Sequence, residues 1–266
     1  TAGTGGFAVS SAGVAGYGSL AIEVVLGIFM LLFGINFSVY HLIMLRKFKE
    51  AFCMEEVKVY LSIVFLSTLA IMFNIAKMAG GFGHALRQSF FQVASIITTT
   101  GFATVDFELW PEFSKHILVL LMIIGACAGS TGGGMKISRV IILAKSFVAE
   151  IRQIINPKEI ITVRLNDAVV DKKTLDSTRI YVAAYMILLC LFTLVISLDG
   201  LDFTTNFTAV ISCFNNIGPG LAGVGPMANF SVYSDWAQVV LSAAMLTGRL
   251  EIFPMLLLFA RSAHDR

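Results

Sequence analysis

Uncharged apolar segments alternate with polar connections along this chain. Residues 24–45 contain no Asp, Glu, Lys or Arg, and comparable segments cover 59–76, 117–135 and 180–198. A last one, 236–260, is interrupted by Arg249 and Glu251. A helix needs about 20 predominantly apolar residues to cross the hydrocarbon core of a bilayer. The pattern therefore predicts a membrane protein with transmembrane helices at these positions.

Two apolar segments are too short to cross a membrane as helices, namely 89–96 and 204–214. Ten helical residues rise only ~15 Å. Each segment runs into a polar, glycine-bearing stretch, 97–103 and 215–220. Such a pattern predicts re-entrant loops, the first over about 88–104. The half-length helix would direct its negative C-terminal end to the membrane centre, and the loop beyond could present carbonyl oxygens to a cation.

The segment 117–135 ends in an unusual run of glycines, Gly125, Gly129, Gly132, Gly133 and Gly134, followed by Lys136. Each glycine weakens a helix by ~1 kcal/mol relative to alanine, so the helix is predicted to stop there and to resume over about 137–149. The alternative is a small-residue packing face, because 125–129 fits GxxxG. That alternative leaves the Gly132–Gly134 run and Lys136 unexplained.

The order span, half-length helix, glycine-bearing loop, span occurs twice, over roughly 57–149 and 179–261. The first residues supply the tail of a third copy, because Thr4-Gly5-Gly6-Phe7 parallels Thr99-Thr100-Gly101-Phe102 and Asn216-Ile217-Gly218-Pro219. Repeats of this kind suit a pore around a pseudo-symmetry axis normal to the membrane. In each loop a glycine stands where backbone could turn its carbonyls inward.

Composition and charge agree with a membrane protein. Of 266 residues, 57% are hydrophobic and 14% charged, against roughly 25% charged in soluble domains. The net charge of +2 does not suggest nucleic acid. If the segment after Leu45 is cytoplasmic, most basic residues lie inside, as the positive-inside rule requires. Six acids then fall outside, where they either concentrate cations or merely favour the water boundary: Asp106, Glu108, Glu112, Asp199, Asp202 and Asp235.

The residue patterns of catalytic sites are missing. Residues 218–223 fit GxGxxG, but they follow a helical segment and lack the strand–helix context of a dinucleotide site. The four histidines are scattered, no GxSxG occurs, and the four cysteines show no CxxC spacing. We therefore expect no enzyme, no organic or covalent cofactor and no metal cluster.

Four motifs together resemble the TrkH/KtrB superfamily of bacterial potassium transporters, and within it the TrkH branch. They are residues 98–102 (TTTGF), 125–136 (GACAGSTGGGMK), 215–220 (NNIGPG) and 248–254 (GRLEIFP). The resemblance covers essentially the whole sequence. It implies an all-α membrane protein with helix–re-entrant pore loop–helix repeats around a pseudo-fourfold axis. It also implies potassium transport through a channel-like pore in the bacterial inner membrane.

By this resemblance, residues 1–50 hold the end of a second pore repeat, 51–178 a third repeat with a cytoplasmic loop, and 179–266 a fourth. The chain begins at Thr1 with no signal-like segment, and we expect it to be a fragment of a longer protein that lacks the first repeat. The family also implies a homodimer in the lipid bilayer and a cytosolic nucleotide-binding regulatory ring. The basic loop 150–178 and the C-terminus are plausible docking surfaces for that ring.

Matching positions assign K⁺ coordination, mainly through backbone carbonyls, to Thr4, Gly5, Gly6, Thr99, Thr100, Gly101, Asn216, Ile217 and Gly218. The alternative is a set of tight glycine turns that pack helices together. The resemblance assigns a gate below this filter to Gly125, Gly129, Ser130, Thr131, Gly132, Gly133, Gly134 and Lys136, with Arg249 as an electrostatic barrier. A structural salt bridge is the alternative for Arg249, because a charge near mid-bilayer needs protein or water around it.

Two other mechanisms compete with a potassium channel. A Na⁺-permeable protein is one, because related plant transporters differ in the first repeat's filter. A cation-coupled secondary transporter with alternating access is the other, because broken helices also occur in that class. Such transporters usually hold carboxylates at a midplane site, and here only Glu23 and Glu251 come near a span interior.

Overall fold

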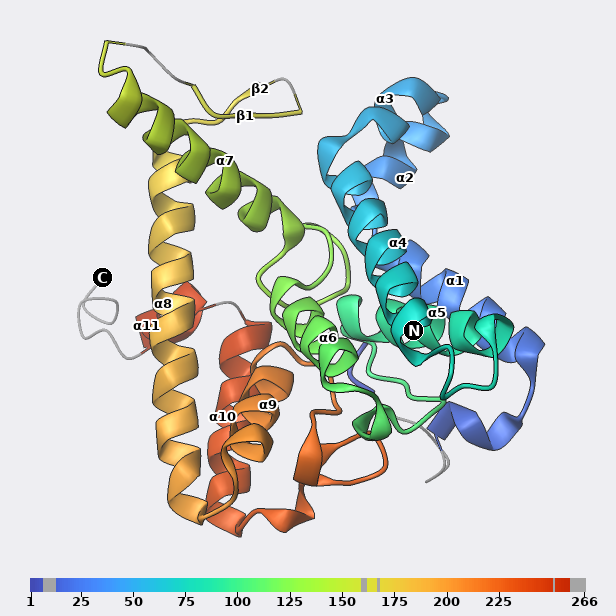
Figure 1. The fold of residues 1–266 in the computed structure, drawn as a ribbon. Helices are drawn as coiled ribbons and strands as arrows, with labels where there is room; N and C mark the ends of the chain where they lie inside the picture. Colours follow the sequence, from blue (N-terminus) through green and yellow to red (C-terminus); the bar gives the residue numbers. More distant parts are fainter. Residues whose placement is uncertain (7–12, 159–161, 167, 251, 259–266) are drawn as a thin grey trace.

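The computed structural model describes residues 1–266 except 7–12, 159–161, 167, 251 and 259–266. Within these described residues the regular structure is almost entirely helical (Figure 1). The α-helices are α1 (Leu20–Phe33), α2 (Phe37–Met44), α3 (Phe48–Cys53), α4 (Glu55–Ile75), α5 (Phe82–Ile97), α6 (Glu112–Ile124), α7 (Ile137–Ile155), α8 (Lys172–Ile196), α9 (Phe203–Phe214), α10 (Asp235–Arg249) and α11 (Ile252–Leu258). Short 3₁₀ turns are η1 (Gly13–Tyr17), η2 (Phe107–Leu109), η3 (Ser197–Asp199), η4 (Ala222–Val224) and η5 (Phe230–Val232), and strands β1 (Arg164–Leu165) and β2 (Ala168–Val169) form an antiparallel hairpin.

In the part of the chain that the structure describes, two helices are long and apolar enough to cross a membrane by themselves: Glu55–Ile75 and the continuous stretch Lys172–Asp199. A third candidate is the pair α1 and α2, which passes the same test together but is bent by 89°. Large apolar side chains are exposed on the outer faces of these helices, among them Phe65 and Phe73 on α4 and Ile187 and Leu194 on α8. An outer surface of this kind suits contact with lipid.

The prediction of one continuous helix over 24–45 is wrong, because the chain breaks between α1 and α2. The Asn36 side chain accepts a hydrogen bond from the Ser38 N–H at 2.9 Å and so caps a new helix. A Cβ added at Gly34 would lie 2.5 Å from the Tyr60 hydroxyl oxygen and 2.8 Å from Thr98. The break therefore lies at a glycine because Tyr60 and Thr98 leave no room for a side chain at position 34.

Other boundaries differ less from expectation. Helix α5 begins at Phe82 rather than near 88, so it is 16 residues long, and α8 begins at Lys172 rather than Ile180. The expected interruption of 236–260 is a true break between α10 and α11, and Glu251 lies outside the described residues. The break at the glycine run is confirmed: α6 ends at Ile124 and α7 starts at Ile137.

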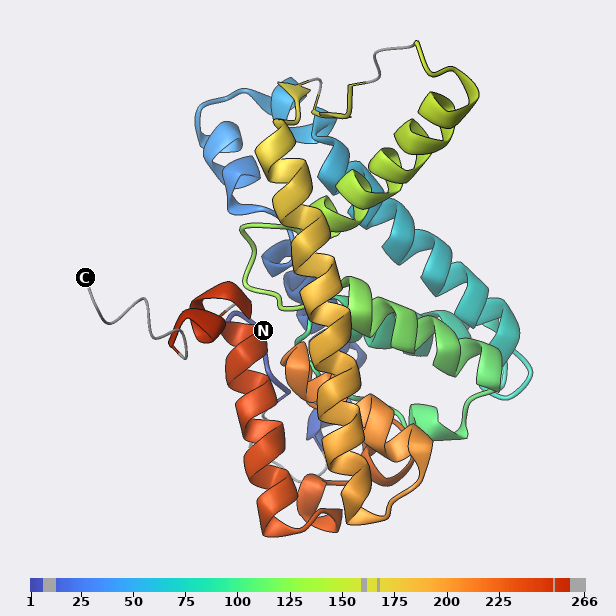
Figure 2. The same cartoon turned by 90° about the vertical axis from the view of Figure 1, so that its left-hand side faces the viewer.

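The helices surround the short helices α5 and α9, whose C-terminal ends lie inside the molecule (Figures 1 and 2). In both views α8 and α10 flank α9, and α4 packs on α5. Helices α2 and α3, the end of α7 and the β hairpin lie at one end of the molecule, while the α8–α9 connection and η5 lie at the other. The first end carries the segments that the charge pattern assigns to the cytoplasm.

A bidentate ion pair joins α1 to α5. Arg87 Nε lies 2.6 Å from Glu23 Oε2, and Arg87 Nη2 lies 2.7 Å from Glu23 Oε1. The Glu23 side chain is only 9% exposed, whereas that of Arg87 is 34% exposed. Helix α5 begins about two turns before the apolar segment that the sequence predicted, and the pair joins this additional part to α1.

We predict that Glu23→Ala lowers the stability of the protein by about 1–3 kcal/mol, because it leaves a partly buried guanidinium unpaired; partial exposure keeps the loss below that of a fully buried pair. The thermal midpoint in detergent measures the loss. Lys47→Ala is the control, since it removes an ion pair whose two side chains are 52% and 60% exposed. Equal midpoints for the two variants would contradict a stabilising role for Glu23.

Candidate functional site

Three short stretches share one backbone conformation: residues 4–6, 99–101 and 216–218, here called the central loops. The first residue of each is left-handed without being glycine, with φ of 48° at Thr4, 54° at Thr99 and 56° at Asn216. Two positions on, each loop has a positive-φ glycine, with φ of 77°, 76° and 119° at Gly6, Gly101 and Gly218. A β-branched residue in this region is uncommon, so tertiary contacts must hold the loops in this conformation.

The central loops meet at one point. The Gly5 N–H donates to the Thr99 carbonyl at 3.2 Å. A Cβ added at Gly6 would lie 3.1 Å from the Ile217 carbonyl oxygen and 3.2 Å from that of Gly101. A Cβ added at Gly101 would overlap the Ile217 carbonyl oxygen outright. The structure therefore brings together all nine residues predicted as a filter, while Phe7 of the first loop lies outside the described residues.

Equivalent serines fasten the second and third loops to their helices. The Ser95 carbonyl accepts from the N–H groups of Thr100 and Gly101 at 2.9 and 3.3 Å. In the same way the Ser212 carbonyl accepts from the Ile217 N–H at 2.9 Å, and its hydroxyl accepts from the Gly218 N–H at 3.1 Å. Both serines are fully buried. The loops are thus rigid continuations of α5 and α9.

The third loop is also tied to the long helices around it. Asn215 donates through Nδ2 to the Tyr185 hydroxyl at 2.9 Å, and Asn216 donates through Nδ2 to the Met245 carbonyl at 3.1 Å. Gly248 of α10 packs directly on the Phe214 carbonyl at the end of α9, with no room for a Cβ. Of these residues, Gly248 was part of a sequence motif, whereas Tyr185 and Met245 carried no signal.

Residues 125–136, here called the glycine loop, lie against the central loops. The Gly133 N–H donates to Thr99 Oγ1 at 2.7 Å, and Thr4 Oγ1 donates to the Thr131 carbonyl at 3.4 Å. A Cβ added at Gly133 would overlap the Asn215 carbonyl oxygen. The glycine loop thus touches the ends of all three central loops. Because this stretch is not helical, it does not form the GxxxG packing face considered as an alternative.

A cavity of about 180 Å³ lies beside the glycine loop and contains cationic side chains. Arg249 donates to the Thr131 carbonyl at 3.3 Å, and Lys136 donates to the Gly132 carbonyl at 2.5 Å. The Arg139 guanidinium lies 3.8 Å from the centre of the Tyr181 ring. The sequence assigned Lys136 and Arg249 to this place but missed Arg139, which α7 brings there one turn beyond Lys136.

The acids at the opposite end of the molecule serve as structural acceptors. Asp202 caps α9 by accepting from the Thr205 N–H at 3.0 Å, and these bonds with Thr205 lower the pKa of the Asp202 carboxyl from its usual value. Asp199 accepts from the Ser234 N–H at 2.9 Å. Glu108 accepts from the Ala222 N–H at 2.7 Å and pairs with Lys115 at 3.2 Å. These contacts favour a structural role for these acids over a purely electrostatic one.

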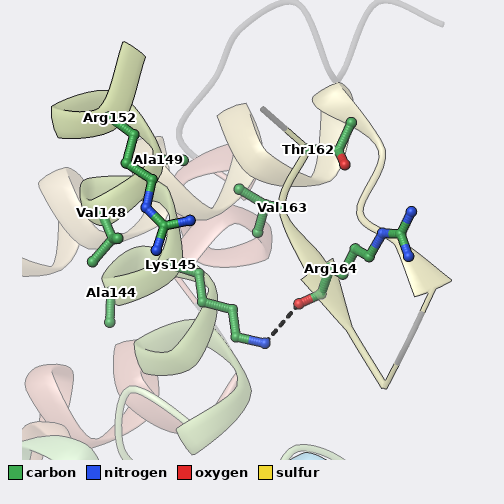
Figure 3. A pocket seen from close by; sticks show the side chains of 8 residues that line it. All are labelled: Ala144, Lys145, Val148, Ala149, Arg152, Thr162, Val163 and Arg164. Carbon is green, nitrogen blue, oxygen red and sulfur yellow. Dashed lines mark hydrogen bonds between the residues drawn. The ribbon is translucent and has the colours of Figure 1, made fainter. Parts of the chain in front are cut away.

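A larger hollow of about 420 Å³ opens between α7 and the β hairpin (Figure 3). Lys145 donates to the Arg164 carbonyl at 2.8 Å and pairs with Glu55 at 2.5 Å, so the hairpin is joined to α7 and α4. The Arg152 guanidinium points into the hollow, whereas the Arg164 side chain points away from α7. In the basic loop 150–178 the strands are β1 and β2, and 159–161 and 167 lie outside the described residues.

The described residues contain no group of three or more His, Cys, Asp or Glu side chains that could hold a metal ion. Within this part of the chain all four cysteines are free; Cys127 and Cys213 are buried, while Cys53 and Cys190 are exposed. The chemistry that the central loops offer is therefore that of main-chain carbonyls and threonine hydroxyls.

Comparison with known proteins agrees with this architecture. The family model TrkH, described as "Cation transport protein", matches residues 75–265. The Trk system potassium uptake protein TrkH of Salmonella typhimurium is 33% identical over 96% of this chain and 53% of its own length. TrkG of Escherichia coli K12 is 31% identical over 98% of this chain and 54% of its own. The crystal structure of the potassium transporter TrkH from Vibrio parahaemolyticus is similar with a TM-score of 0.88 and 30% identity, over 97% of this chain and 56% of that one.

The fold defines an all-α, multi-pass membrane protein, and its relatives place it in the bacterial inner membrane. The chain belongs to the TrkH family of cation transport proteins. It spans about half the length of the curated relatives it matches.

The packing of Gly248 on α9 yields a stability prediction. Gly248→Ala should lower the thermal midpoint by the equivalent of about 1–3 kcal/mol, because the new methyl group displaces the α9 C-terminus. Gly83→Ala is the matched control, since Gly83 is also helical and a Cβ there meets nothing within 4 Å. Its midpoint should not fall. A Gly248→Ala protein as stable as the control would show that this contact is not tight.

Proposed function

We propose that this chain forms part of a potassium-conducting pore, with the central loops as its selectivity filter. The observation that carries the proposal is the meeting of three loops with the same left-handed residue and the same positive-φ glycine. Carbonyl oxygens suit a weakly hydrated monovalent cation, and the central loops contain no carboxylate that would favour a divalent one. The printed names of the relatives, potassium uptake proteins, support K⁺ as the transported ion.

In this proposal the chain supplies three of the four loops of a pseudo-fourfold filter. Residues 1–50 hold the end of a second repeat, 51–178 form a third and 179–266 a fourth. A first repeat and the beginning of the second would complete the ring around the ion path. Support comes from the offset of 117 positions that relates Ser95 to Ser212 and Thr99 to Asn216, each pair having the same main-chain role.

The glycine loop is the proposed gate. It touches the ends of all three central loops, and the Arg249 and Lys136 side chains bond its carbonyls. With Arg139 these side chains place three positive charges around one cavity, which would raise the energy of a cation leaving the filter. Passage then requires the glycine loop and its cations to move aside, with ions flowing down their electrochemical gradient.

We further propose a homodimer that binds a cytosolic nucleotide-binding regulatory ring. The designation "Trk system" in the relatives' names supports a protein of several components. The end of α7 and the β hairpin, which frame the hollow of Figure 3, are the proposed docking face of the ring.

The filter assignment predicts that the full-length protein containing this chain restores growth of a potassium-uptake-deficient host at low K⁺. Gly101→Ser should reduce the K⁺/Na⁺ flux ratio in proteoliposomes by about tenfold or more, because a side chain there displaces the Ile217 carbonyl. Gly3→Ser is the control, since a Cβ at Gly3 meets nothing within 4 Å. The filter assignment is wrong if Gly101→Ser leaves the K⁺/Na⁺ flux ratio unchanged. It is also wrong if the parent protein carries Na⁺ but not K⁺ and fails to restore growth at low K⁺.

The barrier assignment predicts that Arg249→Ala speeds cation passage by about three- to tenfold, because one positive charge leaves the cavity beside the glycine loop. Flux into proteoliposomes at fixed K⁺ gradient measures the change. Lys58→Ala, which removes an exposed charge on α4 outside this cavity, should leave flux unaltered. Slower passage in a folded Arg249→Ala protein would count against the barrier.

A further inference from the structure

Glu56 is a buried carboxylate that the proposed pore does not use. It is the second residue of α4, and only 3% of its surface is exposed. Its Oε1 accepts from the Ala128 N–H at 2.6 Å and from the Ser138 N–H at 3.2 Å. Its Oε2 lies 3.4 Å from Asn36 Nδ2. The Glu56 carboxylate thus bonds to three segments outside α4: the break at Asn36, the glycine loop at Ala128 and the start of α7 at Ser138.

One oxygen of Glu56 holds both flanks of the glycine loop. Ala128 lies near the loop's start, whereas Ser138 belongs to the first turn of α7 just after its end. The residue before α7, Lys136, is left-handed with φ of 71° and its side chain makes no capping bond. The first N–H groups of a helix need acceptors, and the helix dipole favours a negative one. Glu56 supplies this acceptor from a neighbouring helix.

The second oxygen of Glu56 faces the break between α1 and α2, to which the glycine loop is also paired by main-chain bonds. The Cys127 N–H donates to the Gly34 carbonyl at 3.1 Å, and the Phe37 N–H donates to the Gly129 carbonyl at 3.0 Å. Asn36 lies between Gly34 and Phe37 in the break, and its Nδ2 donates to Glu56 Oε2. The break, the glycine loop and the α7 N-terminus therefore converge on one side chain.

We propose that Glu56 is a positioning residue that keeps the glycine loop seated against the central loops. A carboxylate suits this task, because bonds from N–H groups to an ionised acceptor are roughly twice as strong as neutral ones. Loss of the acceptor leaves two partly buried N–H groups, those of Ala128 and Ser138, without this partner, which favours conformations with the loop displaced. The inference concerns the loop's position; only its consequence for ion flux rests on the proposed function.

Cys127 offers a direct readout, since it is fully buried within the glycine loop. The experiment uses the full-length protein in detergent with Cys53→Ser and Cys190→Ser, which removes the exposed thiols. A polar maleimide is added, and its rates of reaction with Cys127 and Cys213 are followed by mass spectrometry. Cys213, buried in α9, reports general loosening of the fold.

Glu56→Ala should raise the Cys127 modification rate by about tenfold, with a smaller rise for Glu56→Gln, because a neutral amide oxygen still accepts a bond. Asn36→Ala, which removes one arm of the contact, should also raise it. Glu55→Gln is the matched control, since Glu55 precedes Glu56 but pairs with Lys145 at 2.5 Å. All four variants should leave Cys213 unchanged.

The proposal is overturned if Cys127 reacts no faster in Glu56→Ala than in the parent, or if Cys213 accelerates equally. Flux measurements on the same proteins separate this inference from the gate. Faster Cys127 labelling together with raised K⁺ flux supports both. Faster labelling with unaltered flux keeps the positioning role of Glu56 and refutes the glycine loop as the gate.

Discussion

Main-chain groups that leave a helix at membrane depth must find partners inside the protein, because lipid offers none. The central part of this structure depends on meeting that requirement. Ser95 and Ser212 satisfy the N–H groups that follow α5 and α9, and Glu56 satisfies those at both flanks of the glycine loop. These bonds hold the non-helical stretches against the helices that flank them. This bonding allows strained φ angles at Thr4 and Thr99 to persist.

Three helices of the described chain end in a break that is followed by another helix. The chain departs from helix at 34–36 after α1, at 125–136 after α6 and at Leu250 after α10. The first two breaks are bonded to each other, and Arg249 at the third reaches Thr131 in the second. The break that is longest and richest in glycine lies between the other two. The non-helical segments therefore form two sets of mutual contacts. The central loops contact one another, and the helix breaks contact one another beside them.

Sequence alone predicted the features that depend on local chemistry. Glycine runs and half-length apolar segments located the central loops and the break at Gly125, because glycine acts on its own backbone. The sequence did not reveal features that depend on contacts between distant residues. The break at Gly34 depends on Tyr60 and Thr98, which are distant in sequence. Glu56 carried no signal, because its burial follows only from the approach of α7 and the glycine loop.

The 89° bend between α1 and α2 has a mechanical consequence. Helix α2 and the following α3 lie at one end of the molecule, joined to α1 through residues 33–37 and to α4 through Met54. Those same residues carry the main-chain bonds to 127–131. A swing of α2 and α3 would act on the glycine loop through these peptide groups. Proline in place of Phe37 would remove only the bond to the Gly129 carbonyl and would leave the bonds to the Gly34 and Phe33 carbonyls.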